Sequence, residues 1–164
     1  MSTDQPQVSV SVGVNASPEI VWGLVSDLTR MGDWSPECTG GKWAGGGPGP
    51  AGPSVGAVFK GTNKIGIRRW STKSKIVAVE PNRKIAWEVS ALGLRAARWT
   101  YLIDPSDDGC RVTETWHDQR GAVINFVGPL ATGVRDRATH NEAGMRRTLD
   151  SLKAAAESRA AGSA

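Results

Sequence analysis

The feature that most constrains this chain is a succession of strand-like segments that ends in one long helical pattern. The strand-like segments cover about 56–64, 68–80, 83–92, 95–104 and 109–118. Only short turns rich in Gly, Pro, Asn and Asp separate them, and such turns join strands that pair antiparallel. We therefore expect an antiparallel meander in which each strand pairs with the next one along the chain.

The carboxy-terminal segment, from about Thr132 to Arg159, shows an apolar stripe at helical spacing. The stripe consists of Val134, Ala138, Asn141, Met145, Leu149, Leu152 and Ala156, while the other faces are charged. An apolar stripe one face wide, on a helix roughly 40 Å long, can pack against one other structural element. The concave side of a curved sheet is the partner that we expect.

The amino-terminal part predicts one more strand and two short helices. The valines at positions 8, 10, 12 and 14 alternate with small or polar residues, which is the period of a strand with one buried face. Ser17-Pro18-Glu19 then combines an N-cap, a proline at the first helical position and an acid near the positive helix end. This helix is expected to run to about Asp27 and to restart briefly before Trp34.

The length of 164 residues fits one domain with its own core, which we expect over residues 7–159. Residues 39–56 carry eight glycines and three prolines and predict an irregular loop with a short strand at 42–44. Only 38 residues precede this loop, too few for an independent domain. Residues 1–6 and 160–164 are expected to be flexible termini.

Composition excludes several functional classes. The formal net charge of +4 has no single focus, so DNA is not an expected partner. No apolar run reaches the roughly 18 residues that a membrane span needs, so no integral membrane segment is expected. The cysteines and histidines, at 38, 110, 117 and 140, lack the spacing of a metal site. We expect neither a metal nor a cofactor.

The amino terminus lacks a basic segment followed by an apolar core, so we expect no secretory signal and a cytoplasmic protein with reduced thiols. A run of six basic residues without an acid lies between Ala57 and Ala78. We interpret it as a solvated outer face, because Lys73 and Lys75 fall opposite to Trp70. RNA is therefore not favoured as a partner, although an RNA- or partner-binding module stays open as a second alternative. A homodimer is compatible with the sequence.

Several short sequence motifs occur in a fixed order along the chain. They are Ala16-Ser-Pro-Glu-Ile-Val-Trp22, Asp33-Trp-Ser-Pro36, Val79-Glu-Pro81 with Ile85-Ala-Trp87, Val112-Thr-Glu-Thr-Trp116, and Asn141-Glu-Ala-Gly-Met145 before Thr148-Leu149 and Leu152-Lys153. Together they resemble the START-like (SRPBCC) superfamily, and specifically its polyketide cyclase/dehydrase-like branch, over nearly the whole chain. The resemblance implies an α+β helix-grip fold. In that fold a curved antiparallel sheet of six or seven strands wraps around a long carboxy-terminal helix, and two short helices follow the first strand.

The resemblance also implies an apolar cavity between the sheet and the helix. Members of the superfamily bind lipids, polyketides, sterols or other apolar molecules, and some are enzymes, so the fold does not decide the function. Seven of the aromatic residues are Trp, against two Phe and one Tyr, and this amphipathic side chain suits a lined hollow as well as a solid core.

Strand parity predicts which side chains face the cavity. Trp87, Trp99 and Trp116 take inward positions on three consecutive strands. Arg95 is expected to face inward too, at the end of the strand 95–104. Residues 68–80 are ambiguous, because Trp70 and Ile76 take one parity and Val77 and Val79 the other, a conflict that a β-bulge would resolve. The predicted ligand-binding residues are Phe59, Trp70, Trp87, Trp99, Tyr101, Glu114, Trp116, Asn141 and Met145.

Glu114 is the most informative polar residue, because it lies between Val112 and Trp116 on the predicted buried face. An unpaired buried carboxylate costs several kcal/mol or raises its pKa. We interpret it either as a cavity acid that contacts a ligand or as a structural group bonded to a neighbour. Asn141, which interrupts the helical stripe, has the same two interpretations.

The sequence favours a protein that binds an apolar small molecule, whether a lipid, a polyketide-like molecule or an aromatic compound. The alternative is a polyketide cyclase/dehydratase-type enzyme, with Glu114 and Tyr101 as catalytic acid/base residues and Arg95 or Asn141 polarising a carbonyl. No histidine is expected in the interior, which favours binding. The apolar, glycine-containing segment 121–134 is expected to be a mobile lid or portal, or else a packed connector.

Overall fold

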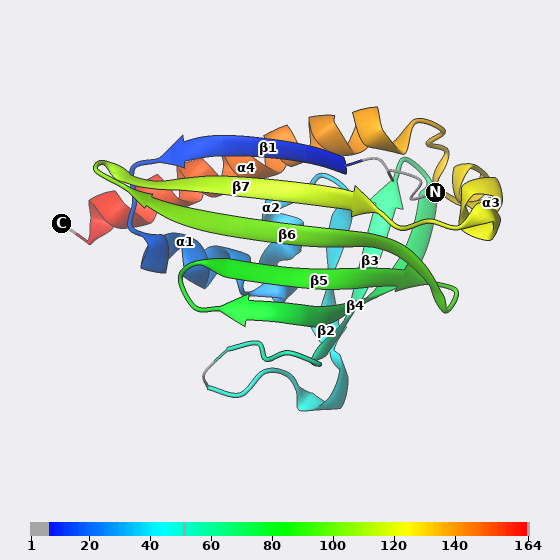
Figure 1. The fold of residues 1–164 in the computed structure, drawn as a ribbon, viewed down its shortest axis with the longest axis horizontal. Helices are drawn as coiled ribbons and strands as arrows, with labels where there is room; N and C mark the ends of the chain where they lie inside the picture. Colours follow the sequence, from blue (N-terminus) through cyan, green and yellow to red (C-terminus); the bar gives the residue numbers. More distant parts are fainter. Residues whose placement is uncertain (1–6, 51, 164) are drawn as a thin grey trace, which may run out of the picture.

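The computed structural model describes residues 7–50 and 52–163 (Figure 1). The expected flexible terminus at 1–6 lies outside these residues. The strands are β1 Gln7–Val14, β2 Cys38–Trp43, β3 Val58–Ile65, β4 Arg68–Glu80, β5 Lys84–Ala91, β6 Leu94–Ser106 and β7 Gly109–Asp118. The helices are α1 Pro18–Val25, α2 Met31–Trp34, α3 Ala122–Thr132 and α4 Arg137–Gly162, with 3₁₀ turns at Leu28–Arg30 and Ala44–Gly46.

The strands form one antiparallel sheet of seven strands in the order β1-β7-β6-β5-β4-β3-β2. Sequential pairing from β2 to β7 confirms the expected meander, and β1 joins the edge beside β7. In Figure 1, α4 runs lengthwise beside β1, and it packs against β1, α1 and α2. The predicted helix-grip fold is therefore the observed one.

The core lies between the sheet and the helices, where the predicted stripe of α4 meets inward strand positions. Met145, Leu149 and Leu152 on α4 are each 1% exposed, and Ile85 and Val112 on the sheet are fully buried. At the amino terminus of α1 the Ser17 Oγ accepts a hydrogen bond from the Ile20 N–H at 3.5 Å, as the capping pattern predicts.

The expected start of the long helix at about Thr132 is wrong, because α4 begins at Arg137 and the residues before it form a separate helix, α3. Gly133 adopts φ 78°, and its N–H bonds to the Pro129 carbonyl at 2.9 Å, which ends α3. Asp136 then caps α4 by accepting a hydrogen bond from the Thr139 N–H at 3.1 Å. Val134 lies between the two helices. Its hydrophobic spacing predicts a continuous helix, but Gly133 and the Asp136 cap interrupt it.

Two β-bulges set which side chains face inward. The register of β4 against β5 shifts between Ile76 and Ala78, which resolves the parity conflict predicted for residues 68–80. A second shift pairs Val89 with Ala97 but Ser90 with Arg95. The extra residue in β6 turns Arg95 outward, where it is exposed, so its predicted inward position is wrong.

Candidate functional site

A cavity of about 580 Å³ lies between the concave face of the sheet, α3 and α4. This volume falls within the range of roughly 300–1,000 Å³ typical of small-molecule sites. Its wall includes every residue predicted to bind a ligand, namely Phe59, Trp70, Trp87, Trp99, Tyr101, Glu114, Trp116, Asn141 and Met145. Their contact with a ligand stays a prediction.

Three indoles form a row across the middle of the sheet. Trp87 on β5 is the register partner of Trp99 on β6, and Trp99 is the partner of Trp116 on β7. The Trp87 ring also stacks on Tyr101, with centroids 5.7 Å apart and an interplanar angle of 23°. Because directly opposed side chains share one face of a sheet, the row presents a largely apolar, flat-sided wall to the cavity.

Glu114 brings a carboxyl group into this apolar wall. It is 3% exposed, it pairs in register with Tyr101, and its Oε2 has no hydrogen-bond partner. Burial raises the pKa of Glu114 to about 8, although a hydrogen bond from Tyr101 lowers it part of the way back. The group is therefore mostly protonated at neutral pH and can both donate and accept a hydrogen bond inside the cavity.

Tyr101 differs from Glu114 because a tyrosine side chain is ordinarily neutral at physiological pH, whereas a glutamate side chain is ordinarily charged. Burial, and next the neighbouring Glu114, raise the pKa of Tyr101 well above its usual value. The phenol therefore keeps its proton at any physiological pH. It serves as a hydrogen-bond donor beside Glu114 and not as a base.

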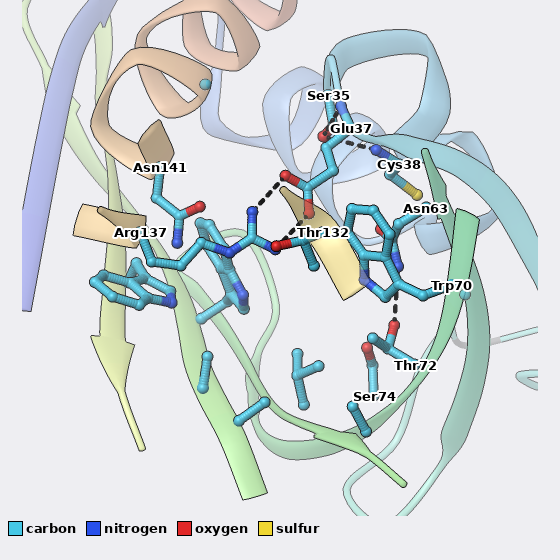
Figure 2. Close-up of a pocket in the computed structure, with 18 of the residues that line it drawn as sticks. Ser35, Glu37, Cys38, Asn63, Trp70, Thr72, Ser74, Thr132, Arg137 and Asn141 are labelled. Carbon is cyan, nitrogen blue, oxygen red and sulfur yellow. Dashed lines mark hydrogen bonds and ion pairs between the residues drawn. The ribbon is translucent and has the colours of Figure 1, made fainter. Parts of the chain in front are cut away.

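A second group, which we call the Glu37 cluster, consists of Glu37, Arg137, His140 and Trp70. Figure 2 shows Glu37, Arg137 and Trp70 of this cluster. The Arg137 guanidinium donates to both Glu37 oxygens, at 2.8 and 3.0 Å, and lies 5.7 Å from the centroid of the Trp70 ring. The His140 Nε2 lies 3.2 Å from Glu37 Oε2. The cluster joins the amino-terminal end of α4 to the segment before β2 and to β4.

Sequence reasoning missed the Glu37 cluster, in which His140 borders the cavity with its side chain 38% exposed. Both Arg137 and His140 line the cavity with Glu37. Glu37 and Arg137 are 100 positions apart, so no local spacing relates them. The spacing of Arg137 and His140, which puts them on one face at the start of a helix, was the one available signal.

The wall formed by β3 and β4 is more polar than the indole row. The Asn63 amide nitrogen donates to Thr72 Oγ1 at 3.3 Å, and Ser74 lies on the same strand as Thr72 (Figure 2). Asn141, 8% exposed, lines the cavity from α4. The cavity thus has an aromatic side and a side with hydroxyl and amide groups, which suits a mainly apolar molecule that carries a few oxygen atoms.

Most of the connector 121–134 forms α3, and this helix covers one side of the cavity. Val123, Ile124 and Val127 from this helix lie on the cavity wall. Its function as a lid stays a prediction.

Across 7–50 and 52–163, no three His, Cys, Asp or Glu side chains come together as metal ligands. Among these residues, too, every helix is too short or too polar to cross a membrane.

Comparisons with known proteins agree with this architecture. Residues 5–157 match the family described as polyketide cyclase / dehydrase and lipid transport. A polyketide cyclase-like protein from Corynebacterium glutamicum is 30% identical, with a TM-score of 0.53 over 92% of this chain and 88% of that one. A search of curated proteins finds no match.

More distant solved structures share the fold. The di-domain aromatase/cyclase StfQ of the steffimycin biosynthetic pathway is 15% identical, with a TM-score of 0.71 over 94% of this chain and 51% of that one. The Aha1 dimer from Colwellia psychrerythraea is 16% identical, with a TM-score of 0.63 over 93% of this chain and 96% of that one.

Proposed function

We propose that this chain, which belongs to the polyketide cyclase / dehydrase and lipid transport family, binds an apolar small molecule in the cavity between its sheet and α4. The observation that carries the proposal is the combination of a cavity of about 580 Å³ with an indole wall and one unpartnered carboxyl oxygen. A flat or elongated apolar body fits against the indoles. A hydroxyl or carbonyl on the ligand fits the Glu114 carboxyl, which gains the hydrogen bond that it lacks.

The proposal also places the protein in the cytoplasm. Cys38 and Cys110 are free thiols, and burial raises the pKa of each, which keeps both protonated and poorly reactive. Free thiols of this kind are typical of a reducing compartment.

The test is a titration of tryptophan fluorescence with a matched pair of probes, 2-naphthol and naphthalene. Both should quench the cavity indoles, and 2-naphthol should bind more tightly because its hydroxyl reaches Glu114. Ala97→Phe, which fills space on the cavity wall, should abolish quenching by both probes. Ala143→Phe, on the exposed face of α4, is the control and should leave quenching unchanged.

Native mass spectrometry of the purified protein provides an independent measurement. We expect a co-purifying apolar molecule whose mass is absent from the Ala97→Phe variant. If neither probe quenches the fluorescence and no small molecule accompanies the wild-type chain, the binding proposal is wrong.

A second candidate function is acid catalysis on a polyketide-like substrate, and the protonated Glu114 favours it. A carboxyl group with a pKa of about 8 holds a proton that it can give to a departing hydroxyl, so that water leaves. The resulting carboxylate can then take the proton from the neighbouring carbon, which restores the acid and leaves a carbon–carbon double bond.

The β-hydroxy ketone 4-hydroxy-4-phenylbutan-2-one tests the catalytic candidate, because its dehydration gives a conjugated enone that absorbs light. Wild-type protein should accelerate the reaction, while Glu114→Gln should bind 2-naphthol but lose the acceleration. Equal rates for both proteins would leave binding as the function of the cavity.

A further inference from the structure

One end of the molecule exposes an unusual amount of apolar surface. We call six of these side chains the apolar rim: Ile67, Leu92, Leu94, Val123, Phe126 and Leu130. Ile67 is 95% exposed and Leu92 is 87% exposed, so these are whole side chains in contact with solvent. Contiguous exposed apolar side chains of this size mark interaction surfaces in soluble domains.

The apolar rim borders the cavity. Leu92, Leu94 and Val123 also line the cavity wall, so the turn between β5 and β6 and the helix α3 border the same opening. The turn between β3 and β4, which carries Ile67, lies at the same end of the sheet as α3 in Figure 1. Arg68 from that turn reaches Gly133 at the end of α3, and α3 packs against β4.

The helix α3 is unusual in its own right. Its sequence, AVINFVGPLAT, contains no charged residue. A helix that is apolar all round is normally buried, yet Phe126 is 79% exposed and Leu130 is 70% exposed. Because the inward side of α3 already faces the cavity, its outward side requires a second apolar environment.

Basic residues accompany the apolar rim. Lys64, Arg68 and Arg69 flank Ile67, and Arg95 follows Leu94, and all four are exposed; we call these four residues the basic fringe. Among the acids near this end, Asp118 is held by Arg120 at 2.6 Å, while Asp136 caps α4. The exposed charge beside the apolar rim is therefore mainly positive.

We propose that this end of the protein docks onto an anionic lipid bilayer. The apolar rim enters the boundary between headgroups and acyl chains, and the basic fringe contacts the lipid phosphates. Docking would open the cavity mouth directly onto the membrane. A second copy of this chain fits less well, because a two-fold contact sets the same patch against itself and opposes two basic fringes.

The test is co-sedimentation of the full chain with vesicles of phosphatidylcholine, either pure or with 30% phosphatidylglycerol. We expect binding to the anionic vesicles that weakens as salt is added. Phe126→Asp should weaken binding about tenfold or more, because the side chain loses its apolar insertion and adds a negative charge. Arg95→Gln should weaken it about fivefold, the effect of about 1 kcal/mol per basic residue. The control is Val55→Asp, which changes a residue 65% exposed in the connection between β2 and β3 and should bind as the wild type does.

Three results would overturn the docking proposal: no sedimentation with anionic vesicles, equal binding to both vesicle types, or a loss as large in Val55→Asp as in Phe126→Asp. A dimer that dissociates in Phe126→Asp would instead assign the rim to self-association. Docking and the proposed function are separable, because 2-naphthol quenching without vesicles should survive Phe126→Asp. A wild-type chain that binds vesicles but not the probe would refute only the cavity proposal.

Discussion

Replacing Glu114 with Gln should make the protein more stable, and increasingly so as the pH rises from 5 to 8. The folded carboxyl has a pKa of about 8, against an ordinary value of 4.5 for a glutamate side chain. Between these two values the unfolded chain has released a proton that the folded chain retains, so the free energy of unfolding falls as the pH rises. The loss is about 1.4 kcal/mol per pH unit and roughly 5 kcal/mol over the whole interval. Glutamine keeps the shape of the side chain and removes the titration.

The assay is urea unfolding followed by tryptophan fluorescence at several pH values between 5 and 8.5. Lowered pKa values at Glu19, Asp136 and Glu157 also make stability depend on pH, in the opposite direction and at more acidic pH. Both proteins share those groups, so the difference between the two stability curves isolates Glu114. Glu80→Gln, which removes an exposed carboxylate outside the cavity, is the control. If the difference between wild type and Glu114→Gln does not depend on pH, the cavity solvates this carboxylate, and the reasoning about its protonation is refuted.

Three further changes test the packing. Leu149→Ala should lower the free energy of unfolding by about 2–5 kcal/mol, because this side chain is 1% exposed in the core, and denaturant unfolding measures the loss. Gly109→Ala should lower the free energy of unfolding by about 2 kcal/mol or more, because the residue has φ 142° and a Cβ there would collide with the backbone of β1. Gly13→Ala is the control: it has open space around it and should change this free energy by less than about 0.5 kcal/mol. Glu37→Gln should lower stability by about 1–3 kcal/mol, because it leaves Arg137 half-buried with a weaker partner, and a double-mutant cycle with Arg137→Gln should show coupling.

The sequence predicted the fold well because its determinants are local. Alternation in the strands, short polar turns and the Ser17 cap each act within a few residues, and the order from β2 to β7 follows from pairing neighbours along the chain. The pairing of β1 with β7 joins distant segments and has no such local signal. The errors arose where one residue overrides a pattern. The additional residue in β6 reversed the direction of Arg95, and Gly133 together with the Asp136 cap moved the start of the long helix from about Thr132 to Arg137.

The candidate site was predicted in part, for a related reason. Parity assigns a side chain to the inner face of the sheet, and it correctly placed Glu114 and the three indoles at the cavity wall. It says nothing about contacts between distant segments. The ion pair of Glu37 with Arg137 joins residues 100 positions apart, and only the folded chain brings them together.

Strand parity also does not determine whether the space opposite the sheet is filled. The side chains of the α4 stripe determine it. From Leu149 onward, Leu149, Leu152 and Ala156 are buried and pack into the core. Before Leu149 the inward positions carry Asn141, Gly144, Met145 and Thr148, and all four line the cavity. Met145 is a large apolar side chain that also packs into the core, but Gly144 and Thr148 are small and Asn141 is a polar amide. These three positions therefore supply less apolar volume than the residues from Leu149 onward. The cavity lies where the helix presents these shorter or polar side chains to the sheet.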